Sequence, residues 1–144
     1  MKYTCQLILK LPRERIAEIF DDPGNIFEWQ EGLEACELIE GEPGRPGGKS
    51  RLLYNIDGRV LEMIETVTVW NPPDEMTAVY EAGKVWNEVK NLFYVNDENS
   101  TLWICANEFR VRGFYKIIFS LFPGTCRKQT EKYMNDFKAY AESL

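Results

Sequence analysis

Two segments of the chain place charged side chains among apolar ones, and these residues could do chemistry. In VWNEVKNLFY, Glu88 and Lys90 alternate with other residues, and in LWICANEFRV, Glu108 and Arg110 do the same. This alternation is typical of β-strands, where every second side chain shares a face. A carboxylate that faces an apolar interior has a raised pKa and is a candidate general acid or base. An inward Lys90 or Arg110 would instead orient an acidic group of a ligand.

The sequence leaves open which face of these strands points inward, because both faces of the last strand are partly apolar. If Glu88 and Glu108 face solvent, they form cross-strand pairs with Lys or Arg, each worth about 0.2–1 kcal/mol. The same alternatives apply to Glu62 and Glu65, which the alternation places on opposite faces of one strand.

The chain contains no histidine, and this excludes several kinds of catalytic site. Ser-His-Asp and Cys-His nucleophiles and histidine-ligated metals all require that side chain. No Asp, Glu or Cys spacing is typical of a metal site, and GEPGRPGG lacks the Gly-Lys-Ser/Thr ending of a phosphate-binding loop. We therefore expect neither a metal nor a cofactor.

Composition limits the partners and the compartment. The 144 residues carry a formal charge of -6, which disfavours nucleic acids and anionic membrane surfaces. No apolar run approaches the roughly 18 residues that span a bilayer, so we expect no stable membrane insertion. The N-terminus has the pattern of a strand rather than of a signal peptide. Cys5, Cys36, Cys105 and Cys126 are widely spaced and are expected to be reduced thiols of a cytoplasmic protein.

The elements that would position these residues follow from apolar periodicity. A strand over Tyr3–Lys10 precedes a helix that Pro12 opens and DDPG ends, and then a short helix over residues 25–33. Six strands are expected next: Ala35–Glu40, Lys49–Ile56, Arg59–Trp70, Thr77–Ala82, Trp86–Val95 and Thr101–Val111. The apolar stretch Phe114–Phe122 returns to helical spacing, and Thr125–Ser143 is predicted to be a long amphipathic helix.

The element order β-α-α-β-β-β-β-β-β-α predicts one α+β domain over residues 1–144. A seven-stranded antiparallel sheet needs cover on one face, and the last helix is the only sizeable cover. Its apolar stripe runs through Cys126, Thr130, Met134, Phe137, Ala141 and Leu144. We expect a curved sheet wrapped around this helix, with space at the wide end near the two short helices.

The chain resembles the START-like, helix-grip superfamily, in particular its SRPBCC branch of polyketide cyclases/dehydrases and lipid-transport proteins. The resemblance covers essentially the whole chain and rests on LPRERIAEIFDDPGNIFEWQEGL, ELIEGEPGRPGGKSRLLY, ETVTVWNPPDEM and the final helix. DDPGNIFEWQEGL, which contains Trp29, is the most specific segment. The resemblance implies a large apolar cavity between sheet and helix. Members bind lipids, sterols, polyketides or other hydrophobic molecules, and only some are enzymes, with catalytic residues that differ between subfamilies.

We therefore predict a domain that binds a small hydrophobic molecule, a lipid or a polyketide-like or aromatic compound, without a covalent bond. Ligand contacts are expected from Trp29, Leu52, Tyr54, Tyr80, Trp86, Met134 and Phe137, with polarity from Glu88, Glu108 or Arg110 if inward. Phe27 and Trp29 are either the rim of the cavity mouth or core anchors of the short helix. The oligomeric state stays open.

Two other functions remain as alternatives. In a cyclase or dehydratase, an inward Glu would remove a proton next to a carbonyl while Tyr hydroxyls stabilise the enolate. A pair of inward polar groups converging on one spot would favour that enzyme, whereas a single buried carboxylate favours binding. A protein-interaction module is the second alternative, and exposed aromatic residues such as Trp103 in one patch would favour it.

Overall fold

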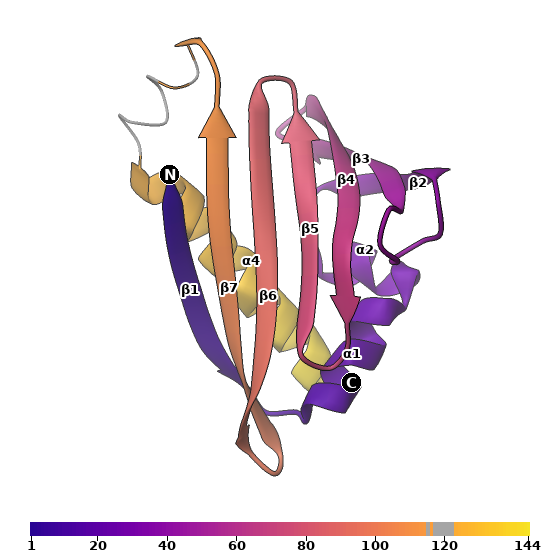
Figure 1. Ribbon diagram of the computed structural model, residues 1–144, viewed down its shortest axis with the longest axis vertical. Coiled ribbons are helices and arrows are strands. Elements are labelled where there is room, and N and C mark those ends of the chain that lie inside the picture. The colour runs from indigo at the N-terminus through magenta and orange to yellow at the C-terminus, as the bar shows by residue number, and fades with distance from the viewer. Residues whose placement is uncertain (115, 117–122) are drawn as a thin grey trace.

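The structure is a computed structural model that describes residues 1–114, 116 and 123–144 (Figure 1). Its elements are β1 (Lys2–Leu9), α1 (Arg13–Asp21), the 3-10 turn η1 (Pro23–Asn25), α2 (Ile26–Trp29), β2 (Leu33–Glu40), β3 (Lys49–Ile56), β4 (Arg59–Asn71), β5 (Glu75–Ala82), β6 (Val85–Asp97), β7 (Ser100–Val111) and α4 (Pro123–Ser143). The predicted order is confirmed, with bounds that differ by a few residues. Most of the predicted helical stretch Phe114–Phe122 lies outside the described residues.

The strands form one antiparallel sheet in the order β1-β7-β6-β5-β4-β3-β2. Figure 1 shows this sheet in front and α4 behind it, with β1 and β2 at opposite edges. Asp57 and Gly58 both have positive φ, 52° and 81°, in the turn between β3 and β4. A two-residue hairpin turn of the I′ type requires positive φ at both positions, which explains why Asp-Gly occurs there.

The segment between α1 and β2 is fixed by polar side chains. The Asp22 carboxylate accepts a hydrogen bond of 3.0 Å from the Gly24 amide and starts the 3-10 turn. Asn25 donates to the Ile19 carbonyl oxygen and accepts from the Tyr140 hydroxyl of α4. These contacts hold α2, and the residues that follow it, against α4.

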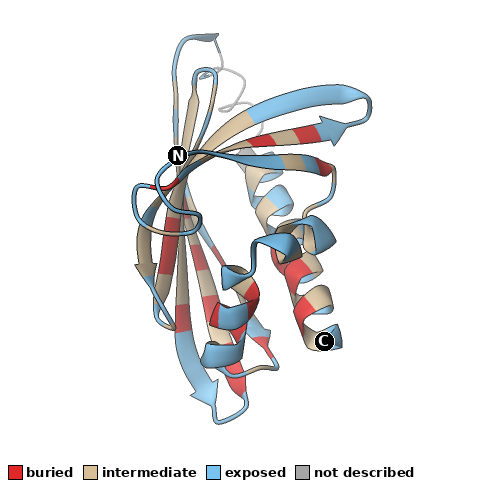
Figure 2. Cartoon of the chain, turned by 90° about the vertical axis from the view of Figure 1, so that its right-hand side faces the viewer, coloured by how far each residue is buried: buried red, intermediate tan, exposed pale blue. Residues whose placement is uncertain are grey.

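The core lies between α4 and the concave face of the sheet. Met134, Phe137 and Ala141 of α4 are buried, and Phe137 stacks on Phe20 of α1 at 4.4 Å. Figure 2 shows these buried bands of α4 turned toward the sheet. The middle of the predicted stripe is therefore inward, whereas Leu144, which follows the last helical residue, is exposed.

Strand register assigns the two faces of the sheet. Phe93 of β6 pairs with Trp103 of β7, and Trp103 contacts Phe137 at 5.3 Å, so this pair faces α4. Alternation then places Val89, Asn91, Cys105 and Asn107 inward with them, and the residues between them outward. The same register continues into β5 through the pairs Asn91–Met76 and Val89–Ala78.

None of the helices in the described ranges combines the length and the apolar composition that a membrane-spanning helix requires.

Candidate functional site

The charged residues first singled out on β6 and β7 lie on the outer, convex face. Glu88 pairs with Glu108 in register, and Trp86 pairs with Arg110, each offset by one residue from the inward set. Arg110 is 3.0 Å from Glu108, and its guanidinium lies 4.4 Å from the centre of the Trp86 ring.

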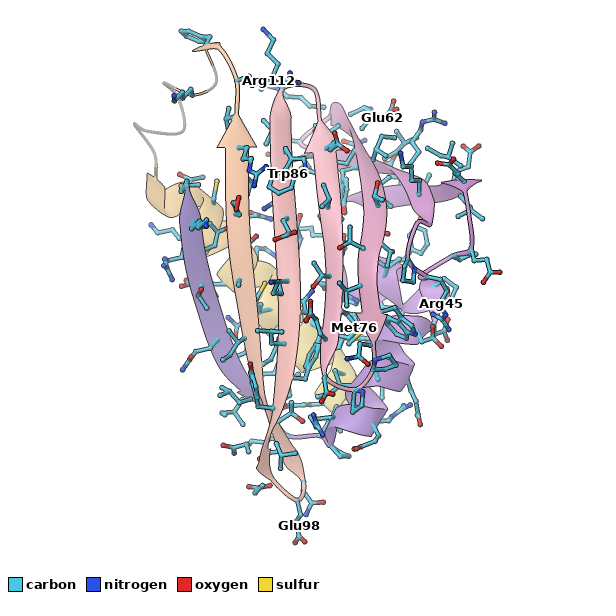
Figure 3. All side chains as sticks on the ribbon, in the orientation of Figure 1. Arg45, Glu62, Met76, Trp86, Glu98 and Arg112 are labelled. Atoms are coloured by element: carbon cyan, nitrogen blue, oxygen red, sulfur yellow. The ribbon has the colours of Figure 1, made fainter. Side chains whose placement is uncertain are left out.

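The sheet therefore separates Trp86 and the other three residues from α4. Figure 3 labels Trp86 on β6. This separation corrects the expectation that Trp86 and Arg110 contact a ligand, and the condition that Glu88 or Glu108 point inward is not met. The reason is the packing of Phe93 and Trp103 on α4, which fixes the opposite parity as the inner one.

A row of polar residues crosses the inner face instead. Ser50 of β3 pairs with Glu65 of β4, Glu65 pairs with Tyr80 of β5, and Tyr80 pairs with Asn87 of β6. Asn87 donates a hydrogen bond of 3.3 Å to the side-chain oxygen of Asn107 on β7. Adjacent strands are about 4.8 Å apart, so directly paired residues form one continuous row. Its neighbours on the inner face are Leu52, Met63, Val67, Ala78 and Val89.

Glu65 is the one carboxylate at the inward-facing mid-strand positions of β3 to β7, strands that the structure describes in full. Burial raises its pKa, and a hydrogen bond with Tyr80 opposes the rise only in part. None of the ion pairs among the described residues includes Glu65. A carboxyl whose pKa is raised by burial and that has no salt-bridge partner is a candidate functional group.

Two tyrosines accompany Glu65. Burial raises the pKa of Tyr80, and the nearby Glu65 carboxylate raises it further. Burial likewise raises the pKa of Tyr54, whose hydroxyl donates a hydrogen bond of 2.5 Å to Oε1 of Gln30; Tyr133 of α4 also contributes to that rise. Both hydroxyls therefore stay protonated near neutral pH and can donate to an oxygen or accept from a donor.

The inner face differs in packing from one end to the other. At the α1 end, Leu9, Phe93, Trp103 and Phe137 are at most 3% exposed. Around the polar row, the following inward residues are only half-buried: Met63, Glu65, Val67, Ala78, Tyr80, Asn87 and Val89. Other protein atoms therefore leave part of this inner surface uncovered.

Of the predicted ligand contacts, Leu52, Tyr54 and Tyr80 come together on the inner face. Leu52 and Tyr54 are buried, 0% and 5% exposed, and form a small cluster with Tyr80 packed against it. Met134 and Phe137 also face the sheet but belong to the closely packed core. From the sequence, Glu65 is only one of two alternating carboxylates whose faces stay open. The other one, Glu62, lies on the outer face and accepts a hydrogen bond of 2.9 Å from Arg51.

Trp29 and Phe27 have different environments. Trp29 packs edge-on against Phe137 at 5.2 Å and Phe20 at 6.1 Å, as a core anchor does. Phe27 is 44% exposed. Trp103 is 3% exposed, so it offers no surface to a partner protein.

A surface groove of about 610 Å³ lies between α4 and the segment that comprises α2 and the α2–β2 connection. Its lining includes the acidic side chains of Glu28, Glu31 and Asp136, and Lys132 pairs with Glu31 at 2.8 Å and with Asp136 at 2.6 Å. Gln30 also lines the groove and accepts the hydrogen bond from Tyr54. The groove therefore adjoins the inner site through Gln30.

The cysteines and the potential metal ligands contribute no further site. All four cysteines are free thiols, and burial raises the pKa of Cys105 to about 12, which keeps it protonated. Within the described parts of the chain, no three Cys, Asp or Glu side chains are grouped to hold a metal ion.

Solved structures share this arrangement along nearly their whole length. The Zhui aromatase/cyclase from Streptomyces sp. R1128 has a TM-score of 0.81 at 13% identity, over 99% of this chain and 93% of that one. A START superfamily protein from Mycobacterium smegmatis has a TM-score of 0.79 at 16% identity, over 99% and 98% of the two chains. The fold is START-like.

Ara h 8.0201 is a third solved structure with a similar fold. Its TM-score is 0.75 at 12% identity, over 100% of this chain and 99% of that chain. The predicted helix-grip architecture is thereby confirmed. No family model and no curated protein matches the sequence. At such low identities the START-like similarity establishes the fold, so function has to be argued from the residues of the inner face.

Proposed function

We propose that the protein binds a small, mostly apolar molecule non-covalently between the concave face of the sheet and α4. One observation supports this most strongly: inward residues around Glu65 and Tyr80 stay half-buried, while the same face is closely packed at the α1 end. An apolar wall with a few convergent polar groups is the usual composition of a small-molecule site.

Apolar and polar residues of the inner face would contribute to binding in different ways. Met63, Val67 and Val89 offer apolar surface, and covering it stabilises a complex by about 25 cal/mol per Å². Tyr80 and Glu65 supply hydrogen bonds in the middle of that surface. Such groups fix the orientation of a ligand, because a buried polar group that finds no partner costs free energy.

Binding is tested with the neutral, polarity-sensitive dye Nile red and with native mass spectrometry of the purified protein. We expect one dye per chain with strengthened emission, or a co-purified molecule that solvent extraction releases and that competes with the dye. Trp86→Ala is the control for adsorption to the outer face, because Trp86 lies there. The proposal is contradicted if native mass spectrometry detects only the mass of the protein and no dye binds. It is also contradicted if Trp86→Ala abolishes dye binding.

The contact between Glu65 and Tyr80 supports enzymatic proton transfer as a second candidate function. Glu65 would remove a proton next to a carbonyl of the ligand, and the Tyr80 hydroxyl would donate to the enolate oxygen. Exchange of the α-protons of 1-tetralone in D₂O measures this reaction. Acceleration by the parent protein that Glu65→Gln abolishes supports the enzyme, whereas no acceleration leaves non-covalent binding as the function.

A further inference from the structure

Among the described residues, none of the ion pairs joins the Glu65 carboxylate to a Lys or Arg side chain. The inward mid-strand positions of β3 to β7 carry no Lys or Arg. Positions 115 and 117–122, outside the described ranges, are Tyr, Ile, Ile, Phe, Ser, Leu and Phe, none of them basic. A carboxylate that is partly removed from water and has no cation beside it is costly, so a cationic ligand group would lower that cost.

Aromatic rings and hydroxyls surround this carboxylate. Tyr80 pairs with Glu65 in register across β4 and β5, and Tyr54 is close enough for Glu65 to raise its pKa. Ammonium groups are attracted to the faces of tyrosine rings, and they donate hydrogen bonds to carboxylates and to phenol oxygens. A ligand carboxylate would instead meet the like charge of Glu65.

The surroundings of the site are acidic as well. The groove beside Gln30 carries three acidic side chains, Glu28, Glu31 and Asp136, and one basic side chain, Lys132. The whole chain has a formal charge of -6. Such a field raises the local concentration of cations and lowers that of anions.

We propose that the ligand is an apolar molecule with one basic amine, whose ammonium group binds Glu65 and whose apolar body lies along Met63, Val67 and Val89. This inference rests on the proposed binding function, because it names the ligand class of the same inner site. Tyr80 would hold the ammonium group from the neighbouring strand.

The pH dependence of amine binding follows from the groups that face Glu65. These are Tyr80 of β5, Tyr54 of β3 and Cys36 of β2, with Tyr133 of α4 beyond Tyr54. Burial raises the pKa of Tyr80, Tyr54 and Cys36, so these three are neutral at neutral pH. The affinity for an amine should therefore rise with pH as Glu65 ionises, until the amine itself loses its proton.

The test compares three ligands with one carbon skeleton: 2-(1-naphthyl)ethylamine, 2-(1-naphthyl)ethanol and 1-naphthylacetate. Isothermal titration calorimetry with the full chain should give the tightest binding for the amine, by about tenfold or more over the alcohol. The carboxylate should bind weakest. Glu65→Gln, an isosteric change, should abolish the preference for the amine while the alcohol still binds.

Glu88→Gln is the matched control, since it makes the same chemical change on the outer face and should keep the amine preference. Circular dichroism and Nile red binding show that each variant is folded. If the parent binds Nile red but shows no preference for the amine, or if Glu65→Gln retains the preference, the amine inference is wrong and the binding function stands. If neither Nile red nor any of the three compounds binds, the binding function itself fails, and the inference with it.

Discussion

The two ends of the concave face show what the same architecture does when it is packed and when it is left open. At the α1 end, four aromatic rings from α1, β6, β7 and α4 contact one another, at centroid distances of 4.4 to 6.0 Å. At the polar row, the inward side chains of β4, β5 and β6 are half-buried and include Glu65, Tyr80 and Asn87. We infer that the first end supplies stability and the second end supplies the site.

This difference has a physical origin in the side chains. Large rings at the α1 end fill the space between sheet and helix, and close packing of this kind stabilises a fold. Small and polar residues at the other end, such as Ala78 and Asn87, leave space and place hydrogen-bonding groups in it. The two ends should therefore respond in opposite ways to the same kinds of substitution.

The largest effect is expected in the packed end, from Phe137→Asp or Met134→Asp. Each places an unpaired charge at a position that is 0% or 2% exposed, which should lower the free energy of unfolding by about 4 kcal/mol or more. Thermal midpoints measure the loss. If both variants have the same thermal midpoint as the parent, α4 does not cover the sheet as described.

Trp29→Ala should rank next, with a loss of about 3 kcal/mol in unfolding free energy, because its ring packs on Phe137 and Phe20. Phe27→Ala, two residues away, should change stability by less than about 0.5 kcal/mol, since Phe27 is 44% exposed. Denaturant titration of both variants checks this contrast. Equal losses would mean that α2 does not divide its aromatics between core and surface.

Glu65→Gln should change how stability depends on pH. Burial raises the folded-state pKa of Glu65, so the folded protein holds this proton more tightly than the unfolded chain does. The resulting stability is present below the unfolded pKa of about 4.3 and is lost as pH rises through the folded pKa.

The unfolding free energy of the parent should therefore fall, relative to that of Glu65→Gln, as the pH rises above about 4. Denaturant titrations at several pH values measure the difference, with Glu88→Gln as the outer-face control. A parent curve that runs parallel to that of Glu65→Gln would show that Glu65 is not desolvated.

The smallest effect is expected on the outer face, from Arg110→Gln. Its guanidinium lies over the Trp86 ring at an exposed site, where such a contact contributes about 0.5–1 kcal/mol. Stability should drop by no more than this, and Nile red affinity should stay at the parent value. A clear loss of dye affinity would mean that part of the binding site lies on the outer face of the sheet.

The element order could be predicted because its signals are local. The Asp57-Gly58 turn, the strand alternation and the α4 stripe through Met134 and Phe137 each need only a few neighbouring residues. The inward parity of β6 and β7 could not be predicted, since Leu92 and Ile104 are as apolar as their inward neighbours, and only the contact with Phe137 decides between the faces.

The site itself was harder to predict than the fold, and Glu65 shows why. Alternation separates Glu62 from Glu65 but does not say which of them is inside. Counting outward from the Asp57-Gly58 turn pairs Glu62 with Leu53 and Glu65 with Ser50, and Arg51 then lies on the same face as Glu62. That short ion pair on the outer face is the signal that could have assigned Glu65 to the inner face.

The central claim is that the inner face is open at the polar row, and Nile red binding to Ala78→Phe tests it most directly. Ala78 is inward and half-buried, whereas Ala141 of α4 is 0% exposed in the packed core. We predict that Ala78→Phe folds with near-parent stability and loses dye affinity about tenfold or more, because its ring occupies the ligand space. Ala141→Phe should be overpacked and lose about 1–3 kcal/mol of stability. A folded Ala78→Phe variant that binds Nile red as tightly as the parent would contradict the claim.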